Sequence, residues 1–318
     1  AAKDLPSARR RVALVTGGSS GVGFVTALML AKRGATVVIA SRSEAQGKEA
    51  VSKIRRKLPV AYRDCGVEWL KLDLGDFVAI RSFAALFIDK YRQLDILINC
   101  AGVMMPAEKE VTRQGLEVQF GTNHAGHFLL TSLLKDLLID TGTERLPSRV
   151  VNVSSVAHAF SFGGLDFDDL SCDRKAYDRV SQYAASKLAN LLFTYEAQRR
   201  LAASGQRGLI FTAAHPGYSA TRLQRHVCCG GVLNTIFAQS AEMGALPIAL
   251  AALDELPVME RSTNEWYYGP AGVFPPAPFA PLSGYPCVSK SSSMSHSTDH
   301  AAQLWSATET LVNEKFQL

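Results

Sequence analysis

The sequence predicts an α/β fold, a single doubly wound domain with a mostly parallel sheet and helices on both faces. Short, continuously apolar runs alternate with helical stretches, a glycine-rich turn follows the first run, and the 318 residues are 47% hydrophobic and 20% charged. Continuously apolar strands are buried on both faces, and right-handed crossovers between parallel strands place helices there. A chain of this length buries about 75% of its unfolded surface, which allows one large core.

The first half of the chain alternates strands and helices. Residues 12–15 are a β-branched apolar run, and the helical pattern after them ends at Gly34, where glycine favours a helix stop. The following patterns predict a strand at 36–40, a helix at 43–57, a strand at 67–72, a helix at 76–91 and a strand at 96–99. Each of these helices can act as a crossover between parallel strands.

The second half continues the alternation and then loses it. A helical stretch at 114–138 precedes a strand at 150–153, and a helix at 181–203 precedes a strand at 209–214. The weaker patterns beyond residue 221 predict a helix at 240–253, a last strand at 266–268, irregular Pro/Gly/Ser-rich surface at 269–302 and a closing helix at 303–314. No repeat or second domain is visible, so residues 1–318 are predicted to form one domain.

Composition and charge exclude several kinds of function. The net charge is +5, but the basic clusters at residues 9–11 and 55–57 lack interleaved aromatic residues, so we expect no nucleic-acid partner. The six cysteines form no C-x-x-C pair, and we expect neither a disulfide framework nor a metal site. No apolar run approaches the roughly 20 residues that span a bilayer. We expect a cytoplasmic protein, although a chain that starts at Ala1 leaves open an upstream anchor or targeting segment and membrane association.

The turn after the first strand predicts a dinucleotide site of the Rossmann type. Its glycines permit a tight turn and let backbone N–H groups and a helix N-terminus approach a pyrophosphate. A glycine-rich turn alone is equally typical of a structural loop, but its place between a strand and a helix favours the nucleotide site. The residues expected to contact the cofactor here are Thr16, Gly17, Ser19, Ser20, Gly21, Val22 and Gly23.

The ends of the second and third strands bear on the choice of cofactor. An acidic residue after the second strand would bind free ribose hydroxyls, but this chain has Ser41 and Arg42. Because a guanidinium binds a phosphate bidentately, NADP(H) is favoured over NAD(H), the alternative being a merely solvated or helix-capping arginine. Asp73 and Leu74 follow the third strand, where an adenine would lie; a helix N-cap is the competing role for Asp73 or Asp76.

A second group of residues predicts acid–base chemistry. Tyr183 and Lys187 are four residues apart and therefore share one face of a helix. A tyrosine with a pKa near 10 exchanges protons poorly at neutral pH, and a neighbouring positive charge lowers that pKa. Such a pair alone usually lies on a surface, but here Ser154 and Ser155 end the strand at 150–153 and bring hydroxyls to the same sheet edge.

These motifs, in this order over residues 12–221, resemble the short-chain dehydrogenase/reductase family. They are the TGxxxGxG turn, Asn99-Cys100-Ala101-Gly102, Asn123, the Ser-Ser pair, Y-x-x-x-K, and His215-Pro216-Gly217 followed by Thr221. Residues 115–131, 183–194 and 266–270 look like its retinol dehydrogenase-like branch. The resemblance implies the strand order 3-2-1-4-5-6-7 and a homo-oligomer.

The resemblance also implies a role for each matching residue. Tyr183 would be the general acid/base, Lys187 would lower its pKa and bind the nicotinamide ribose, Ser155 would bind the substrate oxygen, and Asn123 would hold a water of a proton relay. Cys100 replaces a second Asn of the family, which puts one hydrogen bond of the cofactor loop in doubt. Beyond the residues of the glycine turn, the implied cofactor contacts are Ser41, Arg42, Asp73, Leu74, Asn99, Ala101, Gly102, Tyr183, Lys187, Pro216, Gly217 and Thr221.

Together these features predict an NADPH-dependent oxidoreductase that interconverts a carbonyl and an alcohol on an apolar substrate, such as a retinoid, a steroid or a lipid aldehyde or ketone. Reduction of an activated carbon–carbon double bond and a non-catalytic NADP-binding scaffold are the alternatives. Residues 222–239, with the Gly230-Gly231 pair, are expected to form a substrate-side lid, and residues 159–180 a flap. We interpret His124 and His127 as core or interface histidines rather than metal ligands.

Overall fold

The computed structural model describes residues 5–218, 239–254, 266–272 and 283–318. It contains a sheet in the order β3-β2-β1-β4-β5-β6-β7-β8, so the predicted order is confirmed and extended by one strand. β1 to β7 are paired in parallel and β8 runs antiparallel to β7. The strands are β1 (Val12–Thr16), β2 (Thr36–Ser41), β3 (Val67–Lys71), β4 (Ile96–Asn99), β5 (Ser148–Val153), β6 (Leu209–Ala214), β7 (Tyr267–Pro270) and β8 (Pro286–Val288).

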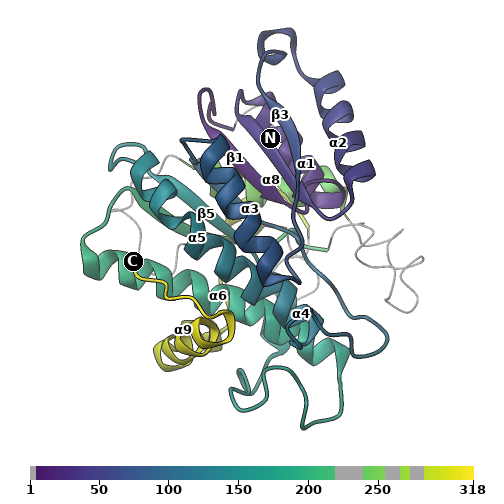
Figure 1. Cartoon of the computed structure of the whole chain (residues 1–318), viewed down its shortest axis with the longest axis vertical. Coiled ribbons are helices and arrows are strands. Elements are labelled where there is room, and N and C mark those ends of the chain that lie inside the picture. The colour runs from purple at the N-terminus through teal and green to yellow at the C-terminus, as the bar shows by residue number, and fades with distance from the viewer. Residues whose placement is uncertain (1–4, 219–238, 255–265, 273–282) are drawn as a thin grey trace.

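Helices cover both faces of the sheet, as the sequence predicts (Figure 1). One layer consists of α1 (Gly21–Lys32), α2 (Glu44–Lys57) and α8 (Ala241–Leu253). The other consists of α3 (Phe77–Lys90), α5 (Gly126–Thr141) and α6 (Arg179–Ser204), with the C-terminal α9 (Thr298–Val312) outside it. Each layer has its own hydrophobic core against the sheet.

The central strands are continuously apolar because each contributes to both cores. In β1, Leu14 packs in the core beside α3, α5 and α6, whereas Ala13 and Val15 pack in the core beside α1, α2 and α8. In β4, Leu97 and Ile98 divide between the two cores in the same way. Successive side chains point to opposite faces, so a strand buried on both faces has no polar alternation.

Helix ends follow the capping residues. The Asp76 carboxylate accepts a hydrogen bond from Val78 N at 2.9 Å at the start of α3, and Asp178 accepts one from Ser181 N at 2.6 Å at the start of α6. These side chains satisfy N–H groups that have no partner within the helix. At the other end of α6, Gly205 adopts a φ of 74°, a conformation that glycine takes without strain. The predicted bounds of these helices differ from the observed ones by at most two residues.

The prediction of irregular surface over residues 269–302 is wrong for its second half. β8 lies within this range, a 3₁₀ turn covers Ser293–His296, and α9 begins at Thr298 rather than at residue 303. A strand of three residues is too short to show periodicity, and its pairing with Tyr268, Gly269 and Pro270 of β7 decides its conformation. The 3₁₀ turn is held by side-chain hydrogen bonds, including the one from Ser295 Oγ to Ser291 Oγ at 2.8 Å.

The C-terminal helix covers an aromatic cluster on α5 and α6. The Trp305 ring lies 5.2 Å from that of Phe128, 5.7 Å from that of Phe193 and 4.9 Å from that of Phe316, measured between centroids. The Arg200 guanidinium lies 4.3 Å from the Trp305 ring, close enough for a cation–π contact. Burial of these rings therefore attaches α9 firmly to α5 and α6.

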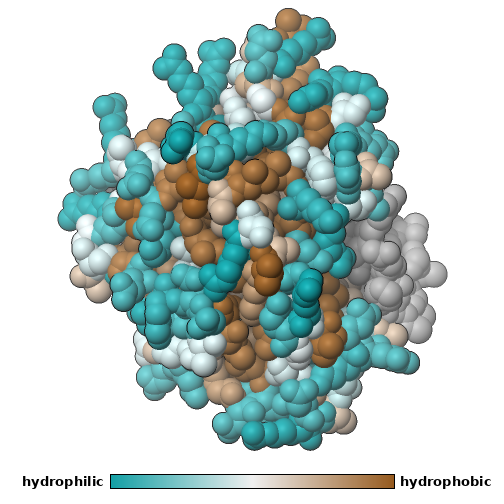
Figure 2. Space-filling model, viewed as in Figure 1, coloured by the Kyte–Doolittle hydropathy of each residue, from teal (hydrophilic) through white to brown (hydrophobic). Residues whose placement is uncertain are grey.

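The molecular surface over α3 and α5 carries both apolar and polar side chains (Figure 2). Apolar side chains gather in the middle of the face on which α3 and α5 lie (Figure 2), and on α3 Val78 is 66% and Leu86 51% exposed. In the part of the chain that the structure describes, no helix combines the length and the apolar character needed to cross a bilayer. The same residues contain no cluster of three His, Cys, Asp or Glu side chains suited to a metal ion.

Candidate active site

Four side chains from three elements meet at the carboxyl edge of the sheet. Ser155 follows β5 by two residues, Asn123 precedes α5, and Tyr183 and Lys187 lie on α6. Tyr183 shares a hydrogen bond with Ser155, and Lys187 Nζ lies 5.6 Å from the centroid of the Tyr183 ring. Lys187 approaches the loop after β4, because a Cβ placed on Gly102 would lie 3.8 Å from Lys187 Nζ. Residues that are far apart in the sequence thus form one site.

Hydrogen bonds to the end of β5 hold α6 in register with the sheet. The Lys187 ammonium donates to Val153 O at 3.1 Å, and Ser154 Oγ donates to Lys187 O at 2.8 Å. One serine of the Ser-Ser pair therefore anchors the helix, while the other, Ser155, contacts Tyr183. The sequence points to both serines but assigns no task to Ser154.

Burial changes the proton affinities of the two α6 residues in opposite directions. Tyr183 is 6% and Lys187 4% exposed. Desolvation raises the pKa of Tyr183 to about 12, against the hydrogen bond with Ser155, and lowers the pKa of Lys187 to about 8. Desolvation of the phenolate is the largest cause of the raised pKa of Tyr183, and the lowering of that pKa by Lys187 stays a prediction. The phenol is protonated at neutral pH.

Asn123 lies in a π-helical turn, Gly121–Ala125, that directly precedes α5. The sequence predicts an uninterrupted helix at 114–138, but periodicity does not reveal a turn with one extra residue. The Asn123 side chain accepts from Val103 N at 2.7 Å and donates to Val103 O at 2.9 Å. It also donates to Ser186 Oγ at 3.0 Å, and Ser186 donates to Tyr183 O at 2.8 Å. Asn123 thus joins the loop after β4 to the helix of Tyr183, and Ser186, inside the Y-x-x-x-K motif, is a contact that sequence reasoning missed.

The glycine turn after β1 forms a cradle for which side chains leave no room. Gly17 has a φ of 66°, and a Cβ there would lie 2.8 Å from Ala101 Cα. A Cβ on Gly23 would lie 2.7 Å from Gly17 O. The first turn of α1 carries no acidic residue, and the Ser20 side chain does not cap its N–H groups. These groups fit the pyrophosphate of a dinucleotide, which an N-terminal helix dipole favours.

Gly17→Ala is expected to lower the free energy of unfolding by about 2 to 4 kcal/mol, because it combines a left-handed φ with a backbone clash. The matched control is Gly205→Ala, where φ is 74° but no atom lies within 4 Å of the new Cβ. The control is expected to lose about 1 kcal/mol, since it carries only the conformational strain. Urea unfolding of both variants measures the difference, and equal losses would contradict a close contact between the turn and Ala101.

Ser41 and Arg42 lie where the second ribose of a dinucleotide is expected. Trp69 Nε1 donates to Ser41 Oγ at 2.9 Å, while Arg42 is exposed and has no ion-pair partner among the described residues. The Trp69 ring packs over Gly47 of α2, where a Cβ would come within 2.0 Å of it. Trp69 thus connects Ser41 at the end of β2 to α2, while binding of a phosphate by the exposed Arg42 stays a prediction.

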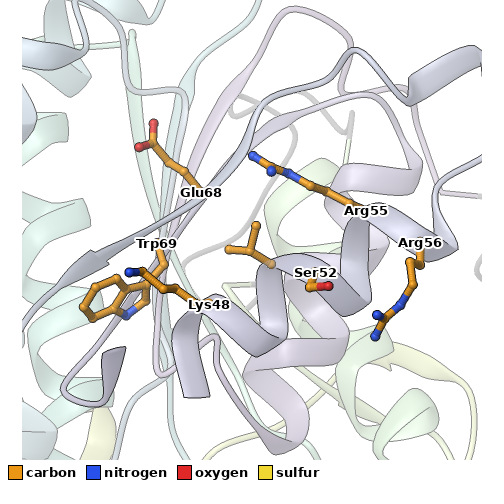
Figure 3. A pocket seen from close by; sticks show the side chains of 7 residues that line it. Lys48, Ser52, Arg55, Arg56, Glu68 and Trp69 are labelled. Carbon is orange, nitrogen blue, oxygen red and sulfur yellow. The ribbon is translucent and has the colours of Figure 1, made fainter. Parts of the chain in front are cut away.

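Trp69 also lines a groove of about 430 Å³ between α2 and β3 (Figure 3). Its lining residues are Lys48, Val51, Ser52, Arg55, Arg56, Glu68 and Trp69. None of them belongs to the four side chains at the carboxyl edge of the sheet. The groove is therefore separate from these four side chains.

Several of the remaining predicted cofactor contacts lie beneath the site rather than on its surface. Thr16 is completely buried, Asn99 is 1% and Leu74 4% exposed. Asn99 Nδ2 donates to Thr131 Oγ1 at 3.0 Å and to Asn152 Oδ1 at 2.9 Å, whereas its Oδ1 has no partner among the described residues. Asp73 accepts from Gly75 N at 2.9 Å, and Asp76, not Asp73, caps α3.

The loop after β6 is held by a hydrogen bond from Gln239. Gly217 has a φ of 62°, and Gln239 Nε2 donates to Pro216 O at 2.6 Å. The sequence predicts Gln239 only as the last residue of the lid and does not predict its contact with Pro216. Thr221 and residues 222–238 of the predicted lid lie outside the described residues.

Cys100 occupies the loop after β4, beside the glycine turn. A Cβ placed on Gly23 would lie 3.4 Å from Cys100 Sγ, and Cys100 N donates to Thr16 Oγ1 at 2.9 Å. Burial raises the pKa of the Cys100 thiol to about 11, so the side chain is uncharged at neutral pH. The backbone of Cys100 therefore connects the loop after β4 to β1. This connection does not depend on the hydrogen bond that an Asn side chain at position 100 would add.

The predicted flap before Tyr183 is held by short-range polar contacts. Asp169 accepts hydrogen bonds from the backbone N–H groups of Asp173, Arg174 and Lys175. Lys109, from the loop after β4, forms an ion pair with Asp173 at 2.6 Å. These contacts connect the segment to the loop that Asn123 also holds.

Comparison with known proteins agrees with this geometry. A family model described as short chain dehydrogenase matches residues 11–165. The chain is 40% identical to human (Homo sapiens) retinol dehydrogenase 13 over 254 residues, which are 77% of this chain and 72% of that protein. It is 43% identical to human retinol dehydrogenase 12 over 249 residues, 77% of this chain and 74% of that protein.

Two solved structures show the same architecture. A crystal structure of an uncharacterized protein from Mycobacterium paratuberculosis is 37% identical, with a TM-score of 0.77 over 100% of this chain and 98% of that chain. The RhlG/NADP active-site complex of Pseudomonas aeruginosa is 25% identical, with a TM-score of 0.60 over 77% of this chain and 91% of that chain. With the site geometry, these similarities show that the chain belongs to the short-chain dehydrogenase/reductase family of oxidoreductases, in its retinol dehydrogenase-like branch.

Proposed function

We propose that this protein is an NADPH-dependent oxidoreductase that interconverts a carbonyl and an alcohol on an apolar substrate. The observation that carries the proposal is the buried phenol of Tyr183, hydrogen-bonded to Ser155, with the Lys187 ammonium 5.6 Å from its ring. The exposed Arg42, the glycine cradle and the similarity to the RhlG/NADP complex support NADP(H) as the cofactor. The relatives named retinol dehydrogenase support a retinoid, a steroid or a lipid aldehyde or ketone as the substrate.

The residues of the site have distinct tasks in this proposal. Bound NADPH supplies the hydride. The Ser155 hydroxyl orients the substrate carbonyl oxygen beside Tyr183, and the phenol, protonated because of its raised pKa, donates a proton to that oxygen. The Lys187 ammonium stabilises the phenolate that forms, and Asn123 holds the water through which the proton is replaced. In the oxidation direction, Tyr183 accepts the proton instead.

Turnover of a panel of aldehydes, ketones and enones with NADPH tests this function. We expect NADPH oxidation with long or bulky aldehydes and ketones. Oxidation with enones alone, and with conversion of the double bond, would replace the proposal by the double-bond reductase. Tight NADPH binding without oxidation by any compound would favour the scaffold, although all four catalytic side chains are present. The homo-oligomer, membrane association and cytoplasmic location stay predictions from the sequence.

The rate of carbonyl reduction is expected to fall as the pH rises through about 8. Lys187 has a pKa lowered to about 8, so its positive charge is present below that pH and is lost above it. Tyr183, with a pKa of about 12, stays protonated over the same interval. The pH profile of kcat/KM reports the ionisations of the free enzyme and checks this directly. A profile that is flat from about pH 7 to 9 would show that the Lys187 charge does not assist the reaction.

A further inference from the structure

Two completely buried histidines at the start of α5 differ in what they contact. His124 Nε2 lies 3.0 Å from Thr308 Oγ1 of α9, which is 184 positions away in the sequence. His127 Nε2 lies 2.9 Å from Thr16 Oγ1, and its Nδ1 lies 3.0 Å from the carbonyl oxygen of Asn123. Only His127 therefore connects the glycine turn to the catalytic Asn123.

The partners of His127 determine where its proton lies. A carbonyl oxygen only accepts hydrogen bonds, so Nδ1 carries the hydrogen and Nε2 is left as an acceptor. The Thr16 hydroxyl lies 3.2 Å from Ile98 O and 2.9 Å from Nε2, and its single hydrogen is donated to the nearer Nε2. Its oxygen accepts from Cys100 N at 2.9 Å and from Ala101 N at 3.0 Å. Burial, together with the nearby Lys187 charge and against the hydrogen bond with Asn123, lowers the pKa of His127 to about 4, so the ring is neutral at neutral pH. The hydrogen bonds thus run in one direction, from the loop after β4 to Asn123.

Each end of this chain of hydrogen bonds holds a part of the site. Thr16 immediately precedes Gly17, whose backbone lies so close to Ala101 that a Cβ would be 2.8 Å from Ala101 Cα. Asn123 at the other end joins Val103 to Ser186, which lies between Tyr183 and Lys187 on α6. A rigid aromatic ring between Thr16 and Asn123 therefore fixes the pyrophosphate cradle relative to the proton-transfer residues.

We propose that His127 is a positioning residue that sets two parts of the site independently. Through Nε2 it holds Thr16, and with it the glycine turn that receives the cofactor. Through Nδ1 it orients the Asn123 carbonyl and, with it, the water relay to Lys187. This second task rests on the proposed function, whereas the first concerns cofactor binding alone.

Four variants separate the two tasks. His127→Phe keeps an aromatic ring but removes both hydrogen bonds. His127→Asn places an amide N–H near the position of Nδ1 and can keep the bond to Asn123. His127→Gln places an amide oxygen near the position of Nε2 and can keep the bond from Thr16. His124→Phe is the matched control, because it removes a second buried imidazole whose ring hydrogen-bonds with Thr308 rather than with Thr16 or Asn123.

Affinity and rate are expected to respond differently. In His127→Phe, the Kd for NADPH should rise about tenfold and kcat should fall about tenfold, the usual range for lost buried hydrogen bonds. His127→Gln should restore the Kd but not kcat, and His127→Asn should restore kcat but not the Kd. His124→Phe should lower Tm while changing neither. Nicotinamide fluorescence gives the Kd without any substrate.

Two results would overturn the proposal. If His127→Phe and His124→Phe change the Kd and kcat equally, the ring only fills space. If the Asn and Gln variants show the same Kd and the same kcat, the two bonds do not act separately; these variants also decide the matter if His127→Phe does not fold. Failure of the proposed function is distinguishable, because wild-type protein would then bind NADPH without oxidising it, while the Kd values would still test the link to Thr16.

Discussion

Tyr183→Phe is expected to reduce turnover by about 10² to 10⁴-fold, the usual effect of losing a general acid or base. The ring remains to pack against its neighbours, but no proton is available to the substrate oxygen. NADPH binding should be nearly unchanged, because the phenol hydroxyl hydrogen-bonds with Ser155 rather than with the glycine cradle. Single-turnover measurement of NADPH oxidation, together with fluorescence titration of NADPH, separates the chemical step from binding.

The control for this prediction is Tyr195→Phe on the same helix. Tyr195 is also buried, and burial raises its pKa to about 12, but its hydroxyl lies 2.8 Å from Ser291 Oγ rather than near Ser155. Its loss is expected to lower Tm without affecting turnover. Equal turnover in the Tyr183→Phe variant and the wild type would remove Tyr183 from the mechanism.

Arg42→Ala is expected to raise the KM for NADPH by about one to two orders of magnitude, which corresponds to about 1.5 to 3 kcal/mol for a charged hydrogen bond. The KM for NADH should barely change, since NADH has no 2′-phosphate for the guanidinium to bind. The side chain is exposed and has no ion-pair partner among the described residues, so its removal is not expected to disturb the fold. Steady-state kinetics with both cofactors measure the ratio.

Arg56→Ala provides the control for charge alone. Arg56 is an exposed arginine in the last turn of α2 that lines the groove in Figure 3, whereas Arg42 precedes the first turn of α2. Its removal lowers the net charge equally but should leave both KM values unchanged at moderate ionic strength, because screening limits long-range attraction. If wild-type protein binds NADH as tightly as NADPH, the assignment of Arg42 to the 2′-phosphate is wrong.

Local sequence signals are sufficient for most of the fold and for the identity of the candidate site residues. The apolar runs of β1 and β4 predict buried parallel strands because each strand side chain is buried on one face or the other, whatever its neighbours are. Asp76 and Asp178 mark helix starts because a capping bond spans only two or three residues. The four-residue spacing of Tyr183 and Lys187 places both on one helix face for the same local reason.

What the sequence by itself determined is therefore the order of elements, the strand order once the family resemblance is used, and which side chains meet at the carboxyl edge. Tertiary structure alone decided β8, whose three residues pair with β7, and the π-helical turn that carries Asn123. It also decided how deeply Tyr183 is buried, and desolvation by the atoms packed around the phenol raises its pKa. Tertiary structure alone also shows that His127 bridges Thr16 and Asn123, because Thr16 and His127 are 111 positions apart in the chain. Contacts between distant segments leave no periodicity or spacing in the chain, and only packing brings them together.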